Sequence, residues 1–176
     1  YIARHDAKFG AISVLRDVTE VKMAGTINSV SVSHDGRVVA AGGQGKEVIV
    51  LETNHVGTSS VTRKKREVVQ RFTRPDNIFS ISLSADGSRI AVGGSDKRVV
   101  VLDVKTGCEL YQQSSFDRIR AVALSKQSQV VAFGGFDQRV QLCNTQHGVS
   151  TRAFPATEVV RGVSLSADGR TLAMGG

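Results

Sequence analysis

SISLSADGSRIAVGG (residues 80–94) is the clearest copy of a unit that this sequence repeats four times. It alternates apolar with small polar residues, turns at Asp86-Gly87, and continues as a second apolar run that stops at a Gly-Gly pair. Alternation with a period of two is typical of a half-buried strand, and Asp-Gly supplies the positive φ of a tight turn. The stretch therefore predicts a β-hairpin. The other copies are SVSVSHDGRVVAAGG (29–43), AVALSKQSQVVAFGG (121–135) and GVSLSADGRTLAMGG (162–176).

The whole repeated unit is longer than the hairpin. The copies start 51, 41 and 41 residues apart, and two more short runs follow each complete hairpin, as in VVVLDVKTG (99–107) and ELYQQS (109–114). The unit is therefore four short strands, and no segment predicts a helix of useful length. The head of the chain, IARHDAKFG (2–10), matches the third run. We accordingly expect a partial unit at 1–22, full units at 23–73, 74–114 and 115–155, and a partial unit at 156–176.

Four antiparallel strands repeated at this period predict an all-β protein made of β-propeller blades. A lone sheet cannot bury both of its faces, so neighbouring blades pack face to face. The expected blade-to-blade core consists of the apolar members of each first strand: Val30, Val32, Ile81, Leu83, Val122, Leu124, Val163 and Leu165. The interleaved serines and alanines are interpreted as small packing residues. A β-sandwich is the alternative, which the fixed period and matching turns disfavour.

Residues 78–107 resemble the WD-repeat propeller family in their hairpin, Gly-Ser stop, Asp-containing turn and terminal strand. The resemblance covers nearly the whole chain, but the motif that names the family is incomplete. The usual Trp is replaced at Leu51, Leu102 and Cys143, whereas Asp6 and Asp103 keep the Asp of the pair. The family's Gly-His pair before the first strand is absent, so its side-chain network cannot form in full. We expect the retained turn residues, Asp96 and Asp137, to cap their own turns.

Composition excludes several classes of protein. The chain has 176 residues, is 40% hydrophobic and 22% charged, and contains no apolar run near the roughly 18 residues of a membrane helix. Cys108 and Cys143 are 35 residues apart with no Cys-x-x-Cys, which favours a reducing compartment, cytoplasmic or nuclear. The four histidines lack metal-ligand spacing and no carboxylate pair recurs where blades converge. We expect no enzyme activity, cofactor, metal or small-molecule substrate.

The longer first spacing indicates an insertion of about ten residues at 55–66, within HVGTSSVTRKKREVVQRFTR (55–74). This segment carries much of the chain's formal charge of +7. Its cations are Arg63, Lys64, Lys65, Arg66, Arg71 and Arg74. A protruding basic loop can meet the phosphates of a nucleic acid or ribosome, anionic lipid or an acidic protein, or act as an import signal. A solvated loop without a partner is the other reading.

The resemblance also implies where partners bind. In the family, the entry to the first strand and the turn between the second and third strands face the usual partner-binding surface. The matching candidates are Lys46, Asn77, Phe79, Lys97, Arg118, Arg120, Phe136 and Arg161. Aromatic and arginine side chains dominate the energetics of protein interfaces, which favours Phe79 and Phe136 beside arginines. An ordinary polar rim is the alternative.

The function expected from these features is that of a non-catalytic scaffold that docks protein partners into an intracellular complex. Two alternatives stay open: an RNA- or ribosome-associated propeller that uses the basic loop, and a regulatory or sensor domain of a larger multidomain signalling protein. The family most often closes with seven blades, whereas this sequence holds about four units. We therefore expect part of a larger propeller, with a four-bladed ring or assembly with a second copy as alternatives.

Overall fold

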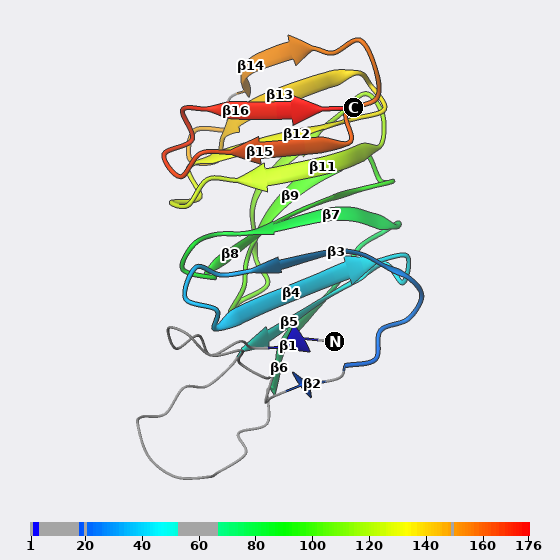
Figure 1. Cartoon of the computed structure of the whole chain (residues 1–176), viewed down its shortest axis with the longest axis vertical. Helices are drawn as coiled ribbons and strands as arrows, with labels where there is room; N and C mark the ends of the chain where they lie inside the picture. Colours follow the sequence, from blue (N-terminus) through cyan, green and yellow to red (C-terminus); the bar gives the residue numbers. More distant parts are fainter. Residues whose placement is uncertain (1, 4–17, 20, 53–66, 149) are drawn as a thin grey trace, which may run out of the picture.

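The computed structural model describes residues 2–3, 18–19, 21–52, 67–148 and 150–176. These residues form three complete four-stranded antiparallel sheets, stacked face to face along the long axis of Figure 1, and two two-stranded sheets. The first complete blade comprises β3 (Ile27–Val32), β4 (Val38–Gly43), β5 (Glu47–Glu52) and β6 (Glu67–Thr73). In the part of the chain that the structure describes, we find no helix with the length and apolarity that a bilayer span requires.

The second blade comprises β7 (Ile78–Leu83), β8 (Arg89–Gly94), β9 (Arg98–Asp103) and β10 (Glu109–Ser114). The third comprises β11 (Ile119–Leu124), β12 (Val130–Gly135), β13 (Arg139–Asn144) and β14 (Ser150–Pro155). The two-stranded sheets are β1 (Ile2–Ala3) with β2 (Val18–Thr19), and β15 (Gly162–Leu165) with β16 (Leu172–Gly175). Strand order within each complete blade follows the sequence, as the repeat predicts.

At three of the described turns between a first and a second strand, a serine and an aspartate two residues later hold the turn. The Ser84 hydroxyl donates to the Asp86 carboxylate at 2.6 Å, and the same carboxylate accepts the Ser88 backbone N–H at 3.0 Å. These hydrogen bonds lower the pKa of Asp86, and the bond from the Ser84 hydroxyl has the largest effect. The arrangement recurs at Ser33 with Asp35 and at Ser166 with Asp168. In the third blade no Asp-Gly is present, and Ser128 itself adopts the left-handed conformation with φ 58°.

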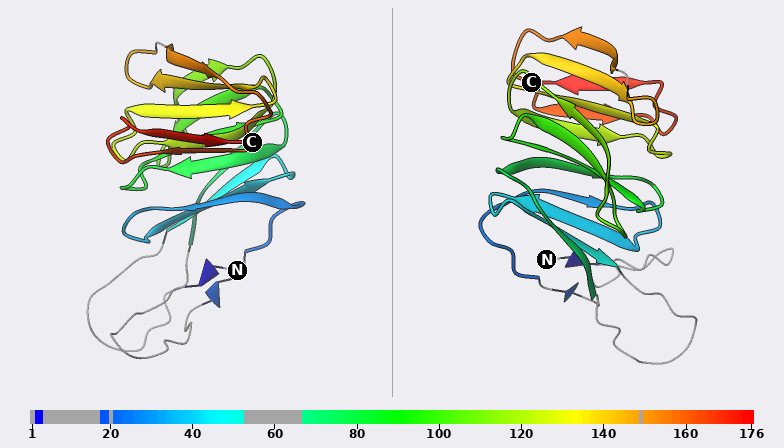
Figure 2. Two further views of the ribbon diagram at one scale, coloured as in Figure 1. Left: turned by 45° about the horizontal axis from the view of Figure 1, so that its top comes forward. Right: turned by 180° about the vertical axis from the view of Figure 1, so that it is seen from behind.

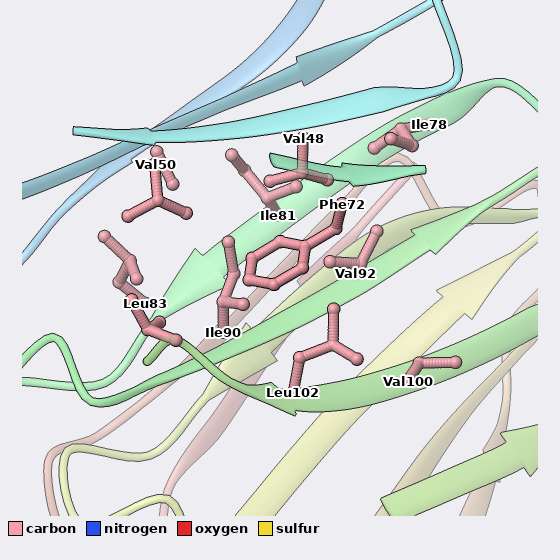
Figure 3. Close-up of a cluster of buried hydrophobic side chains, with 12 residues drawn as sticks. Val48, Val50, Phe72, Ile78, Ile81, Leu83, Ile90, Val92, Val100 and Leu102 are labelled. Carbon is pink, nitrogen blue, oxygen red and sulfur yellow. The ribbon is translucent and has the colours of Figure 1, made fainter. Parts of the chain in front are cut away.

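The core lies between blades rather than within one. One buried cluster joins Val48, Val50 and Phe72 of the first blade to Ile78, Ile81, Leu83, Ile90, Val92, Val100 and Leu102 of the second (Figure 3). A second cluster joins Val99, Val101 and Tyr111 to Ile119, Val122, Leu124 and Phe133 of the third blade. The predicted burial of Ile81, Leu83, Val122 and Leu124 is confirmed.

The predicted burial is wrong for Val30 and Val32 of β3, and Val163 and Leu165 of β15 are only partly buried. Val30 is 65% and Val32 55% exposed, because β3 packs on β4 and β7 with its opposite face open. Val163 and Leu165 are half-buried. Burial at these positions requires a neighbouring blade on the correct side, which a repeat pattern alone does not supply.

The small residues of the first strands do more than fill space. The Ser29 and Ser31 hydroxyls accept the backbone N–H groups of Ile81 and Leu83 in the next blade, at 3.1 and 2.9 Å. Ser80 and Ser82 accept those of Val122 and Leu124 in the same way, at 3.1 and 3.0 Å. Adjacent first strands are therefore joined by serine hydroxyls that satisfy otherwise unpaired backbone donors.

Candidate partner-binding rim

The strand entries and the turns between second and third strands lie at one edge of the blades, which we call the rim. In an antiparallel meander the first strand starts where the second ends and the third begins, so these segments meet at the same edge. The two views of Figure 2 show that the complete blades are stacked in the same sense. The rim therefore gathers residues that are 41 or 51 positions apart in the sequence, as Asn77 and Arg118 or Lys46 and Lys97 are.

Lysines at the rim tie each blade to the loop that enters the next. Lys46 and Lys97 occupy the same position of successive turns, and each has φ of 60°. The Lys46 ammonium donates to the Pro75 carbonyl at 3.2 Å, and the Lys97 ammonium lies 3.6 Å from the Asp117 carboxylate. The Lys46 ammonium also lies 3.9 Å from the Asp76 carboxylate. The Lys46–Asp76 and Lys97–Asp117 ion pairs are about half-exposed, so their contribution to stability is small, roughly 0–1 kcal/mol.

Arginine side chains lie over aromatic rings at three places on the rim. The Arg118 guanidinium carbon is 4.2 Å from the centroid of Phe136, and that of Arg120 is 5.2 Å from Phe79. The sequence predicted these four residues, and the structure brings them together in these two pairs. A cation over a ring is attracted by its quadrupole, by about 0.5–1 kcal/mol at exposed sites. Stacking also restrains the guanidinium while its N–H edge stays available for a carboxylate.

The third pair was missed by sequence reasoning. Arg139 lies over Phe116 at 5.3 Å, and Phe116 is 77% exposed. Phe116, Arg139, Asp117 and Asp137 line an open hollow of about 270 Å³. Hydrogen bonding from the Arg118 backbone N–H, with the nearby Lys97 ammonium adding to it, lowers the pKa of Asp117. Phe116 stands in the loop before the third blade, at the position that Pro75 occupies before the second. A large aromatic residue in this loop was the sequence feature that could have identified Phe116 as part of the rim.

The remaining predicted rim residues are less engaged. Asn77 is half-buried, and its backbone N–H donates to the Asp76 carboxylate at 2.7 Å. Arg161 is exposed, and its backbone N–H donates to the Gly175 carbonyl at 2.8 Å. Among the described residues, the side chains of Arg120 and Arg161 have no carboxylate partner within 4.0 Å. These two guanidinium groups are available to an incoming acidic group.

The placement of Arg74 in a protruding basic loop is wrong. Its side chain is 8% exposed and lies 2.7 Å from the Asp96 carboxylate, itself 9% exposed, and 3.3 Å from Glu109. Arg74 immediately follows β6, where the chain crosses to the next blade, so it is buried between them. Arg71 is half-exposed on β6 and pairs with Glu47 at 2.7 Å. The other predicted cations, Arg63, Lys64, Lys65 and Arg66, lie outside the described residues.

The turn aspartates have a second role beyond the expected one. Asp96 accepts the Arg98 backbone N–H at 3.2 Å and Asp137 that of Arg139 at 3.3 Å, which confirms that they cap their turns. Their second oxygens bind the segment that precedes the same blade: Arg74 at Asp96, and the Ser115 hydroxyl at Asp137, at 2.8 Å. Arg74 and Ser115 each stand four residues before a first strand. An arginine or a serine thus connects each turn to its entry segment.

Four-stranded antiparallel sheets stacked face to face define the β-propeller class of all-β protein. The family model described as "WD domain, G-beta repeat" matches residues 66–103, which span β6 to β9. Residues 66–103 thus contain a WD40 repeat, and the four-stranded antiparallel sheets of the described residues are consistent with WD-repeat blades. No curated protein matches the chain. WD40 repeats in general form non-catalytic modules for protein interaction. Among the described residues, no group of three or more His, Cys, Asp or Glu side chains could hold a metal ion.

Proposed function

We propose that this chain is a non-catalytic docking module whose rim binds an acidic segment of a protein partner. The observation that carries the proposal is the set of three arginines stacked on Phe136, Phe79 and Phe116 across neighbouring blades. Aromatic and arginine side chains are the commonest energetic centres of protein interfaces. A rigid stack of sheets presents them at fixed separations, which limits the entropy lost on binding.

The rim has charge to recognise a carboxylate-bearing partner. Arg120 and Arg161 lack carboxylate neighbours among the described residues, whereas Lys97 and Arg118 share Asp117. Guanidinium groups form bidentate hydrogen bonds to carboxylates, which are about twice as strong as neutral hydrogen bonds. Phosphate binding by the basic segment has less support, because Arg71 and Arg74 are engaged with carboxylates of the chain itself. We place the module in the cytoplasm, as part of a larger assembly or of a multidomain protein.

The test compares partner capture by two single variants. Arg120→Glu reverses charge at the rim, and Arg170→Glu makes the same change at the turn between β15 and β16, at the opposite edge of the blades. Cell extract is passed over each immobilised chain, and bound proteins are quantified by mass spectrometry. We expect proteins retained by wild type and Arg170→Glu to be reduced at least tenfold with Arg120→Glu. Equal recovery on all three chains would overturn the proposed use of the rim.

A second measurement distinguishes electrostatic docking from apolar contact. Retention of the partner should fall as salt is raised from about 50 to about 300 mM, because the Debye length then shortens by roughly half and exposed charges are screened. Retention that does not change with salt would instead indicate that contacts with the phenylalanine rings supply most of the binding free energy. Phe116→Ala, which removes the most exposed ring, should weaken retention less than Arg120→Glu if charge dominates.

A further inference from the structure

The turn between the second and third strands carries an aspartate in two of the complete blades, and the two aspartates have different partners. In the second blade, Asp96 accepts the backbone N–H two residues later through Oδ1 and the Arg74 guanidinium through Oδ2, the latter at 2.7 Å. In the third blade, Asp137 accepts the equivalent backbone N–H through Oδ1 and the Ser115 hydroxyl through Oδ2, at 2.8 Å. The chain thus contains the same carboxylate arrangement twice, once with an arginine bound to it and once with a much shorter serine.

Asp137 differs from Asp96 in having no cation beside it. Among the described residues, no Lys, Arg or His side-chain nitrogen lies within 4.0 Å of the Asp137 carboxylate. Asp117, the other carboxylate that lines the hollow, already lies 3.6 Å from the Lys97 ammonium. Asp137 is therefore the acidic group that remains for an incoming cation, and a carboxylate partly shielded from water attracts a cation more strongly than one in bulk solvent.

The hollow has the size and the lining that suit a single arginine side chain. Its volume of about 270 Å³ lies below the roughly 300–1,000 Å³ of a typical small-molecule site. The Phe116 ring at its edge is 77% exposed, and Arg139 lies over one face of it. The other face is open to a planar cation. A ring beside a carboxylate favours a guanidinium over an ammonium, because the guanidinium stacks on the ring and also forms paired hydrogen bonds to the carboxylate.

The arginine that already lines the hollow does not prevent a second guanidinium from binding. In the second blade, Arg98 stands at the position of Arg139. There Arg74 binds the same carboxylate that accepts the Arg98 backbone N–H, so two arginines coexist around one turn aspartate. Ser115 stands at the position of Arg74 and brings no charge to Asp137. The third blade therefore lacks only the cation that the second blade supplies from its own entry segment.

We propose that the hollow beside Asp137 binds an arginine side chain of a protein partner, as Asp96 binds Arg74 within the chain. The Asp137 carboxylate would accept the guanidinium N–H groups, and Phe116 would stack on the guanidinium plane. The proposal rests on the proposed function for the kind of partner, a protein segment at the rim, and adds that this segment carries an arginine beside its acidic residues. All four lining residues belong to the third complete blade and its entry loop, which has a sheet packed on either side.

The experiment titrates N-acetylarginine amide into the chain and follows the backbone amide signals by NMR. Saturable shifts are expected at Phe116, Asp137 and Arg139. The matching citrulline amide has nearly the same shape but no charge, and it should bind at least fivefold more weakly. Asp137→Asn keeps an oxygen that can cap the turn but removes the charge, so it should weaken binding of the arginine probe at least fivefold. The control Asp76→Asn removes a half-exposed rim carboxylate from the second blade and should bind the probe as wild type does.

A second variant supplies the arginine from within the chain. The side chain introduced by Ser115→Arg should pair with Asp137 as Arg74 pairs with Asp96. It should therefore raise the urea midpoint of unfolding and weaken binding of the arginine probe at least fivefold. The proposal would be overturned by equal binding of the arginine and citrulline probes, by undiminished binding to Asp137→Asn, or by undiminished binding to a folded Ser115→Arg chain.

Failure of this proposal and failure of the proposed function give different results. If the arginine probe binds as expected but capture of proteins does not depend on Arg120, the hollow is an arginine site and the acidic docking at the rim is wrong. If capture depends on Arg120 and the arginine probe does not bind, the rim docks an acidic segment and the assignment of the hollow is wrong.

Discussion

The buried pair between Arg74 and Asp96 gives a stability prediction whose size follows from the structure. Both side chains are less than 10% exposed, with the guanidinium 2.7 Å from the carboxylate. Arg74→Met removes the cation and leaves Asp96 buried without its partner. Removing one member of a buried pair costs about 3–5 kcal/mol, because the remaining charge keeps its desolvation penalty. That is a large fraction of the 5–15 kcal/mol that stabilises a typical domain.

Urea unfolding followed by far-UV circular dichroism measures this loss. With a urea dependence of about 2 kcal/mol per M, Arg74→Met should lower the midpoint by roughly 2 M. The matched control is Arg71→Met, because Arg71 lies three residues away, was predicted to belong to the same basic segment, and also pairs at 2.7 Å. Its side chain is 48% exposed, so its loss should cost about 1 kcal/mol or less.

A double-mutant cycle tests the reasoning itself. Asp96→Asn keeps an oxygen that can cap the Arg98 N–H but removes the charge that needs Arg74. If desolvation of Asp96 is the cause, the double variant Arg74→Met/Asp96→Asn should be more stable than the sum of the two single losses predicts, by at least about 1 kcal/mol. Equal effects of Arg74→Met and Arg71→Met, or strict additivity in the cycle, would refute a buried, charge-dependent role for Arg74.

Three further predictions concern single positions. Gly93→Ala should destabilise the chain by about 1–3 kcal/mol, since its Cβ would overlap the next blade, whereas Gly162→Ala, with open space around it, should unfold at nearly the wild-type urea concentration. Hydrogen bonds lower the pKa of Asp86 below its unfolded value, so their contribution to folding stability is complete above about pH 4 and is lost as pH falls through the folded pKa. Asp86→Asn should therefore reduce the dependence of the melting temperature on pH at the acid side. An unchanged pH dependence would contradict this prediction. Ser82→Ala removes the acceptor of the Leu124 N–H and should cost about 1 kcal/mol while increasing hydrogen exchange at that amide; unchanged exchange would count against the inter-blade bond.

The hairpins and the four-strand unit were predictable because their signals are local. Alternating apolar residues, an Asp-Gly turn and a Gly-Gly stop act within about fifteen residues, so one repeat such as 80–94 contains the full pattern. The serine and aspartate that hold three of these turns are likewise two residues apart, as Ser84 and Asp86 are. The candidate rim residues were also predictable from the sequence, because equivalent positions of a repeat lie at the same edge of their sheets.

Tertiary structure alone decided which residues each equivalent position of the repeat contacts. Val30 and Ile81 have the same place in the repeat, but one is exposed and the other buried, because a preceding blade covers only the second. Arg74 belongs to a basic stretch of sequence, yet Asp96 and Glu109, 22 and 35 residues later, make it a buried ion pair. Phe116 and Arg139 become neighbours only when two strands converge at the rim. Local sequence therefore determined the strands and turns, whereas burial, ion pairing and the open faces depend on contacts between blades, which a local pattern does not encode.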